Sequence, residues 1–164
     1  MNATQEQWRP VIGHEGAYEV SDHGRVRSLS RTLETSVGPR AHHGRVLRPG
    51  TQYGRKFVNL AGRDVRLVHH LVLEAFVGPR PDGMECCHNN GDPSDNRLEN
   101  LRWDTSSSNK RDQLAHGTHS NASKTHCPKG HAYTLENTRH YTYPSGVNAR
   151  FCRTCDRNRQ RKAG

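Results

Sequence analysis

The sequence predicts a small modular α+β protein, and three observations support this fold class. Only 30% of the 164 residues are apolar, which is too few to fill one large core. Apolar and polar residues alternate within the first 67 residues, and the spacing becomes helical from Val68 onward. The tail from Cys127 holds three of the five cysteines but little apolar material. We therefore expect N-terminal antiparallel β-hairpins, a central hairpin-and-helix unit and a metal-stabilised tail.

Residues 1–67 are expected to form a β-rich module of short strands. In each predicted hairpin, two alternating runs flank turn-forming residues, which is the usual hairpin signature. The predicted strand pairs are Tyr18–Ser21 with Arg25–Leu29 and Tyr53–Leu60 with Arg63–Leu67, separated by a loop at 37–44. Strands this rich in arginine suit the groove or backbone of a polyanion, and equally suit the solvated face of a thin sheet.

Residues 68–114 are expected to form the central unit. Apolar residues at Val68, Leu71, Val72, Ala75 and Phe76 fall on one face of a helix. Further along, the pattern predicts a strand at Met84–Cys87, a second strand at Leu98–Trp103 and a helix from about Thr105 to Leu114. The polar segment 115–126 is predicted to be a linker, which leaves residues 127–164 as a separate tail.

Charge is unevenly distributed along the chain. The net charge is +9 and the pI is about 9.8, which points to a polyanionic partner. Residues 1–67 carry 11 basic and 6 acidic side chains, residues 68–114 carry 5 and 8, and residues 115–164 carry 9 and 2. Two basic arms around an acidic middle suit phosphate binding by the arms and cation binding by the middle. A charge of this size could also serve solubility alone.

The central segment resembles the catalytic module of phage-type HNH homing endonucleases, a family of ββα-metal nucleases. The resemblance rests on the run VHHLV at 68–72, on Phe76, on His88 with a glycine three residues later, and on NRLENLRW at 96–103. Upstream, Trp8, the run YEVS at 18–21 and the run GRVRS at 24–28 resemble a small DNA-binding module that is often fused to these nucleases. Together these motifs cover about residues 8–112.

Chemistry and resemblance together nominate a catalytic set. Phosphodiester hydrolysis needs a base that activates water, and a neutral histidine such as His88 suits that role at pH 7. A histidine base needs a partner that fixes its tautomer, and the resemblance assigns this to Asn100. By the same resemblance, Asn109 supplies an oxygen ligand to a divalent cation, Mg²⁺ or Mn²⁺. His69 and His70 are expected to lie at the helix surface in a structural role.

Cys87 is a departure from the family pattern, which has an aspartate before the histidine base as the second metal ligand. A thiolate suits Mg²⁺ poorly and favours softer ions. Three alternatives follow. The ion is held by Asn109, water and DNA phosphate, or the site uses a softer ion that Cys87 can bind, or the chemistry is lost.

The tail contains the spacing of a structural zinc site. Cys127 and His131 are separated by three residues, and Cys152 and Cys155 by two, which gives four soft ligands in two pairs. His126 and His140 are alternative ligands to His131. A zinc ion would explain how so polar a tail folds, whereas without metal the tail would be disordered.

The sequence therefore predicts a metal-dependent HNH endonuclease of phage or mobile-element type that nicks or cuts double-stranded DNA. The predicted DNA-binding residues are Arg25, Arg27, Arg45, Arg55, Lys56, Arg63, Arg153, Arg157 and Arg159. The alternative is a catalytically degenerate DNA-binding protein of the same fold. A zinc-organised RNA-binding module is disfavoured because only 6% of residues are aromatic. With no apolar run of membrane-spanning length and no signal peptide pattern, we expect the cytoplasm, that of a bacterial host if the gene is a phage gene.

Overall fold

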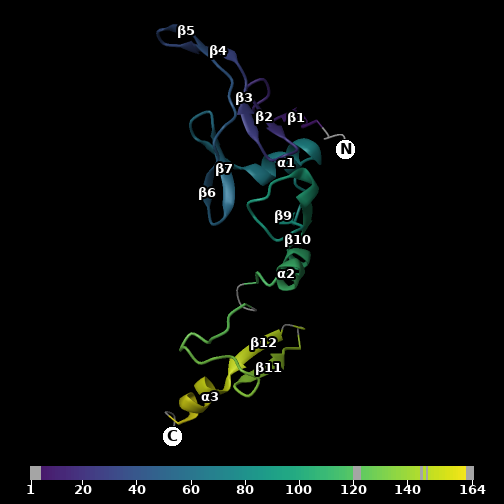
Figure 1. Ribbon diagram of the computed structural model, residues 1–164, viewed down its shortest axis with the longest axis vertical. Coiled ribbons are helices and arrows are strands. Elements are labelled where there is room, and N and C mark those ends of the chain that lie inside the picture. Colours follow the sequence, from purple (N-terminus) through teal and green to yellow (C-terminus); the bar gives the residue numbers. More distant parts are fainter. Residues whose placement is uncertain (1–4, 120–122, 145, 147, 162–164) are drawn as a thin grey trace. The chain divides into compact units, whose positions relative to one another are not determined.

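The computed structural model describes residues 5–119, 123–144, 146 and 148–161 (Figure 1). The chain divides into two compact units, residues 1–116 and residues 117–164. Part of the predicted linker, 120–122, lies outside the described residues, as do 145, 147 and 162–164 of the predicted tail. The mixture of small β-hairpins and helices confirms the predicted fold class. Within the described residues, no helix is long and apolar enough to cross a membrane.

Among its described residues, the first unit contains ten strands, two α-helices and one 3₁₀ turn. The elements are β1 (Trp8–Pro10), β2 (Tyr18–Ser21), β3 (Val26–Ser28), β4 (Arg31–Thr35), β5 (Gly38–His42), β6 (Gly50–Gln52), β7 (Arg55–Leu60), β8 (Asp64–Leu67), α1 (Val68–Phe76), β9 (Met84–His88), the 3₁₀ turn (Leu98–Asn100), β10 (Leu101–Thr105) and α2 (Ser106–Ala115). The strands form two three-stranded sheets, β1-β2-β3 and β6-β7-β8, and two hairpins, β4-β5 and β9-β10, all antiparallel.

Both predicted N-terminal hairpins are present, with two differences from the prediction. β7 begins at Arg55 because Tyr53 (φ 50°) and Gly54 (φ 75°) form the turn after β6. The segment 37–44, predicted to be a loop, contains β5, which pairs with β4 in an extra hairpin. Composition alone misled here because the β4–β5 ladder is built on backbone hydrogen bonds with little apolar burial.

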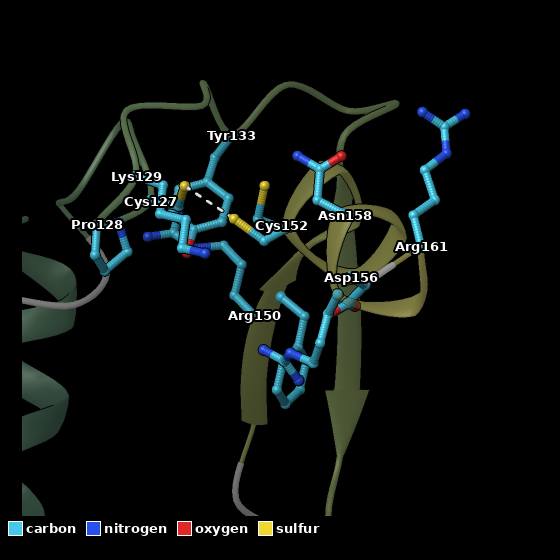
Figure 2. A pocket seen from close by; sticks show the side chains of 12 residues that line it. Cys127, Pro128, Lys129, Tyr133, Arg150, Cys152, Asp156, Asn158 and Arg161 are labelled. Atoms are coloured by element: carbon cyan, nitrogen blue, oxygen red, sulfur yellow. Dashed lines mark hydrogen bonds between the residues drawn. The ribbon is translucent and has the colours of Figure 1, made fainter. Parts of the chain in front are cut away.

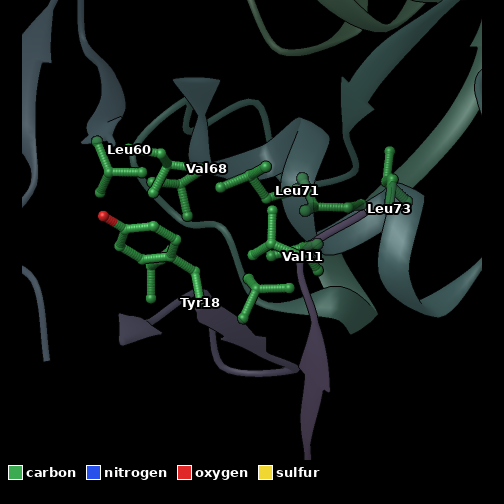
Figure 3. Close-up of a cluster of buried hydrophobic side chains, with 11 residues drawn as sticks. Val11, Tyr18, Leu60, Val68, Leu71 and Leu73 are labelled. Carbon is green, nitrogen blue, oxygen red and sulfur yellow. The ribbon is translucent and has the colours of Figure 1, made fainter. Parts of the chain in front are cut away.

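One hydrophobic core serves both the β-rich module and the central unit. Side chains from β2, β3 and β7 pack directly against α1 and the start of β10 (Figure 3). Val20, Leu60, Leu71, Val72 and Leu73 are essentially inaccessible to solvent. The predicted boundary between residues 67 and 68 therefore falls inside a shared core, between β8 and α1.

α1 has the predicted apolar face and the predicted end. The helix ends at Phe76. Two residues later, Gly78 has a positive φ (126°) and donates its backbone N–H to the carbonyl of Leu73 at 3.0 Å. His69 does not occupy the expected surface position, since only 3% of it is exposed. A histidine one residue after Val68 lies on the side of α1 that the β9–β10 hairpin covers.

The β9–β10 hairpin and α2 follow the predicted order, with one boundary moved. Leu98–Asn100 form a 3₁₀ turn, so β10 begins at Leu101. The turn is held by a hydrogen bond from the Leu98 N–H to the Asp22 carbonyl at 2.8 Å. Thr105 caps α2, accepting a hydrogen bond from the Ser108 N–H at 3.2 Å. Unlike α1, α2 has no buried residue.

The second unit is a hairpin followed by a short helix: β11 (Thr138–Thr142), β12 (Asn148–Cys152) and α3 (Arg153–Gln160). Ahead of the hairpin, Cys127 and His131 are joined by a tight turn with backbone hydrogen bonds of 2.9 Å. Its buried residues are Cys127, Cys152 and Thr138, so the described part of this unit has no apolar core of its own.

Candidate active site and metal centre

The β9–β10–α2 segment carries the three residues nominated for catalysis. His88 ends β9 opposite Leu101, Asn100 lies just before β10, and Asn109 lies in the first half of α2. Antiparallel pairing brings the end of β9 and the start of β10 together, and Thr105 then turns the chain into α2. Residues far apart in sequence are thus held by one short local motif.

His88 is a half-buried histidine with the properties of a neutral base. Burial and the charge of Arg55 lower its pKa, and the hydrogen bond to Asn96 only partly opposes this. Its Nε2 lies 3.3 Å from Oδ1 of Asn96, and its ring packs edge-on against His69 with centroids 5.3 Å apart. The imidazole is therefore uncharged at pH 7 and has a defined orientation.

Asn100 differs from its predicted role. Its side chain does not reach His88. It accepts a hydrogen bond from the Asn90 N–H at 2.9 Å and donates one to the Asp95 carbonyl at 2.8 Å. Asn100 therefore braces the loop 89–97, and the side chain that contacts His88 comes from Asn96. Spacing alone could not distinguish the two asparagines, since both lie in the same NRLEN run.

Asn109 faces the β9 strand from α2. Its Nδ2 donates a hydrogen bond to Oε2 of Glu85 at 2.9 Å, and its Oδ1 accepts a 3.4 Å hydrogen bond from Gln113. The amide oxygen is a suitable hard ligand for a divalent cation. Glu85 is a carboxylate at this position that sequence analysis did not consider.

Cys87 is a buried thiol that does not suit a hard cation. Only 1% of it is exposed, and desolvation raises its pKa, so it stays protonated near neutral pH. A neutral thiol is a poor ligand for Mg²⁺ or Mn²⁺. Of the two proposed protein ligands, Asn109 fits such an ion and Cys87 does not.

Arg102 was not singled out from the sequence, although it lies at the centre of this motif. It pairs with Asp104 on its own strand at 2.9 Å and forms a close ion pair with Asp112 of α2. It also donates a hydrogen bond to the side chain of Asn89. One guanidinium thus connects β10, α2 and the loop that follows His88.

A cluster of three histidines was also missed. His69 packs against both His70, at 4.6 Å between ring centroids, and His88. Desolvation, followed by the charges of the neighbouring histidines, lowers the pKa of His69 to about 3, so it is neutral. The sequence feature that could have indicated this cluster is the VHH run, because its middle residue, His69, lies beside the predicted apolar face of the helix.

The predicted DNA-binding residues of the first unit separate into two groups. Arg25 and Arg27 pair with Glu6 and Glu19 and lie over the ring of Trp8, which indicates a structural role. The others in the first unit are exposed or half-buried, and none has an ion pair among the described residues: Arg45, Arg55, Lys56 and Arg63. Arg55 is close enough to lower the pKa of both His69 and His88.

The second unit brings the four predicted soft ligands together. The ligand atoms of Cys127, His131, Cys152 and Cys155 all lie within 4.8 Å of one another. Sγ of Cys127 is 3.6 Å from Sγ of Cys155, and Nδ1 of His131 is 3.2 Å from Sγ of Cys155. A tetrahedral zinc with bonds of about 2.3 Å separates its sulfur ligands by about 3.8 Å, so the group fits that ion.

The alternative histidines lie elsewhere. His126 hydrogen-bonds to Thr125, and His140 pairs with Arg150 across the β11–β12 hairpin. Although desolvation opposes ionisation, hydrogen bonds from the backbone and side chain of Cys155 hold the pKa of Cys152 at about 6. Desolvation, followed by the hydrogen bonds with Cys127 and Cys152, raises the pKa of Cys155 to about 11, so the two thiols titrate as a pair.

A cavity of about 670 Å³ adjoins these ligands. Figure 2 shows Tyr133 and Arg150 beside Cys127, with Asn158 on α3 and Arg161 just after it. Arg150 lies 4.1 Å from the Tyr133 ring centroid and donates a hydrogen bond to the Lys124 carbonyl. Of the predicted DNA-binding residues here, Arg153, Arg157 and Arg159 all lie exposed on α3.

Two family models match the first unit. Residues 66–111 match the model described as HNH endonuclease, and residues 6–61 match the NUMOD4 motif. Among curated proteins, the chain is similar to DNA endonuclease I-HmuI of Bacillus phage SP01, with 32% identity over 114 residues. That match covers 68% of this chain and 60% of the relative, so the chain spans less than two thirds of the relative's length.

A solved structure, titled as DNA binding and cleavage by the HNH homing endonuclease I-HmuI, is also similar. Its TM-score is 0.48 at 23% identity, and the match covers 94% of this chain and 82% of that one. The resemblance inferred from the sequence is confirmed by the two family models, whose matched ranges contain the predicted motifs. The chain therefore contains an HNH endonuclease domain at residues 66–111, preceded by a NUMOD4 motif at residues 6–61.

Proposed function

We propose that this protein is a divalent-metal-dependent endonuclease that hydrolyses phosphodiester bonds of double-stranded DNA. The observation that supports this most strongly is that the HNH match covers β9, β10 and most of α2, which carry His88, Asn100 and Asn109. The similar phage protein is named a DNA endonuclease, and the named activity of that relative is the one proposed for this chain. By the same comparison, we propose that the protein acts in the cytoplasm of a bacterial host.

His88 is the proposed general base. Its ring is neutral at pH 7 because burial lowers its pKa, so it can accept a proton from the attacking water. The water then attacks phosphorus, the P–O3′ bond breaks, and the products are a 5′ phosphate and a 3′ hydroxyl. Asn100 keeps the loop after His88 in one conformation through its two hydrogen bonds to the backbone.

Asn109 is the proposed protein ligand of Mg²⁺ or Mn²⁺, with water and the DNA phosphate completing the coordination. When bound, such an ion supplies positive charge for the departing 3′ oxygen. Glu85 receives the Asn109 amide hydrogen bond and so turns the amide in a defined direction. Cys87 contributes no hard ligand in this proposal.

DNA binding and zinc binding are the remaining proposed roles, and each is assigned to particular parts of the two units. We assign DNA binding to residues 1–67, through the exposed Arg45, Arg55 and Arg63, and to the arginines of α3 in the tail. In the tail, Zn²⁺ held by Cys127, His131, Cys152 and Cys155 has a structural role. The described part of this unit has no apolar core, so the metal ion stabilises its fold instead.

A plasmid-cleavage experiment tests the proposal. Supercoiled plasmid is incubated with the purified chain and Mg²⁺, Mn²⁺ or EDTA, and nicked and linear products are measured. We expect metal-dependent products that fall at least about 100-fold in His88→Ala, because the base is lost. His43→Ala, an exposed histidine after β5, is the matched control and should cleave normally. Metal-independent products, or equal activity of the two variants, would contradict the proposal.

A catalytically degenerate DNA-binding protein is the second candidate function, and Cys87 is the observation that favours it. A buried, protonated thiol stands where the family has a carboxylate ligand. If cation binding limits the reaction, Cys87→Asp should raise cleavage in Mg²⁺ by about tenfold or more, since carboxylate oxygen suits Mg²⁺. Cys86→Ser, on the core side of β9, is the control and should not raise it. Duplex binding without cleavage in the wild type, in every metal, would favour the degenerate protein.

A further inference from the structure

We propose that Asn96 is the positioning residue of His88, and that the Gly24 turn of the NUMOD4 segment holds Asn96 in place. The inference rests on the proposed role of His88 as the base. It assigns to a different residue the orienting role that the family resemblance gave to Asn100. It also links the N-terminal module physically to the catalytic histidine.

The contact between Asn96 and His88 is direct. Oδ1 of Asn96 lies 3.3 Å from Nε2 of His88, and Asn96 is only 4% exposed. A carbonyl oxygen accepts hydrogen bonds and cannot donate them, so Nε2 carries the ring proton in this arrangement. The lone pair of Nδ1 is then left to accept a proton from water. Neutral histidine has two tautomers, and a buried acceptor selects one of them.

The contact with His88 is the side-chain hydrogen bond of the buried Asn96 amide among the described residues. Among the described residues, its Nδ2 is buried without a hydrogen-bond partner. A buried, unpaired amide is costly, and an apolar residue of similar size would avoid that cost. His69 also packs edge-on against the ring of His88, with centroids 5.3 Å apart. His88 thus contacts a hydrogen-bond acceptor, Asn96, and the uncharged aromatic ring of His69.

Gly24 explains what keeps Asn96 there. A Cβ at Gly24 would lie 2.7 Å from the backbone oxygen of Asn96 and 2.8 Å from its Cβ, so no side chain fits at this position. Beside it, the Leu98 N–H donates to the Asp22 carbonyl at 2.8 Å. The β2–β3 turn is therefore seated directly on the segment that carries Asn96. A shift of this turn would displace Asn96 and, through Asn96, change the position of His88.

The first test reads the tautomer of His88 without any need for activity. Long-range ¹H–¹⁵N spectra of the full chain with ¹⁵N-histidine are recorded at pH 8, and His88→Ala assigns the signal. We expect a protonated Nε2 and an unprotonated Nδ1 in the wild type and in Asn96→Asp, which keeps an acceptor. Asn96→Leu should give averaged nitrogen shifts typical of mixed tautomers. An unchanged His88 spectrum in a folded Asn96→Leu, or the opposite tautomer in the wild type, would overturn the inference.

The second test uses two glycines with nearly identical backbones. Gly24 has φ +74° and Gly16 has φ +73°, but a Cβ at Gly16 would meet nothing within 4 Å. Both alanine variants therefore place a side chain at a similar positive φ, but only the Gly24 variant brings a Cβ against Asn96. We expect Gly24→Ala to alter the His88 nitrogen shifts and to lower the cleavage rate about tenfold or more at saturating DNA. Gly16→Ala should keep the His88 shifts and cleave within about twofold of wild type.

The two readouts separate failure of the inference from failure of the proposed function. If the wild type does not cleave but the tautomer shifts behave as expected, the positioning contact stands and the nuclease assignment falls. If the wild type cleaves and both glycine variants have the same His88 nitrogen shifts as the wild type, the contact between Gly24 and Asn96 has no positioning role.

Discussion

At the scale of single residues, the site depends on groups that are uncharged at neutral pH. Burial lowers the pKa of His69 and His88 and raises that of Cys87. The proposed base, His88, is therefore neutral at pH 7, while the thiol of Cys87 is not available as a thiolate ligand. Both properties arise from burial, which disfavours the charged form of each group.

The dependence of the cleavage rate on pH should reflect the pKa of His88, which burial lowers. A base works in its neutral form, so activity falls as pH drops through its pKa. Because the pKa of His88 lies below the ordinary value of 6.5, activity should be near its plateau at pH 7 and fall only below pH 6.5. Arg55→Gln removes a charge that lowers this pKa, so the acidic limb should move toward higher pH. The measurement is cleavage rate against pH at saturating DNA. Arg63→Gln, also exposed, is the control, and an equal displacement in that variant would contradict the prediction.

At the scale of elements, α1 and α2 are held in opposite ways. α1 places Val68, Leu71, Val72 and Leu73 in the core, whereas α2 has no buried residue. α2 is attached to the β9–β10 hairpin by polar contacts, chiefly the ion pair of Arg102 with Asp112 and the hydrogen bond of Asn109 with Glu85. The helix that carries the proposed metal ligand is therefore the more easily displaced.

Removal of Arg102 should loosen α2 selectively. Arg102→Ala loses two ion pairs and a hydrogen bond, and we expect a loss of about 1–2 kcal/mol of unfolding free energy. Hydrogen exchange should accelerate in α2 more than in α1, since no apolar face retains α2. Arg66→Ala is the matched control, because Arg66 also makes two ion pairs, with Asp64 and with Glu74 of α1. Loss of α1 protection in that control, or unchanged exchange in α2 of Arg102→Ala, would argue against this account.

At the scale of the whole molecule, two units achieve stability by different means. Residues 1–116 share one apolar core built from both the NUMOD4 segment and the HNH domain. Residues 117–164 bury chiefly two cysteines and a threonine among their described residues. Small domains with so little apolar burial need a metal or disulfides, and the four clustered soft ligands point to a metal.

Metal removal should unfold only the second unit. Chelation of the proposed zinc ion should collapse the NMR signals of residues 123–144 and 148–161 into a disordered pattern, because such an ion contributes on the order of 10 kcal/mol in small fingers. Signals of the first unit should remain in place because its core holds no metal ligand. Cys155→Ser should reproduce the effect without a chelator, and Cys86→Ser should not. Survival of the dispersed signals of the tail after complete zinc removal would contradict a structural role for the ion.

The sequence by itself determined the features that depend on local spacing. The hairpin at Tyr18–Ser28, the helix from Val68, the cap at Thr105 and the paired ligands of the tail follow from periodicity, turn residues and ligand geometry, which act over a few neighbouring residues. The β5 strand was missed because its pairing with β4 buries few apolar side chains, and the 3₁₀ turn at Leu98 was missed because its backbone partner, Asp22, is distant in sequence.

Only the tertiary structure decided which side chain of each motif does what. Asn96 and Asn100 stand four residues apart in one run, and the packing of Gly24 against the loop places the first beside His88 while the second braces the backbone. His69 is buried because the β9–β10 hairpin covers its side of α1, and Arg102 is central because α2 returns to it. These contacts join segments up to about 70 residues apart, so they depend on the closing of one shared core, which no local pattern contains.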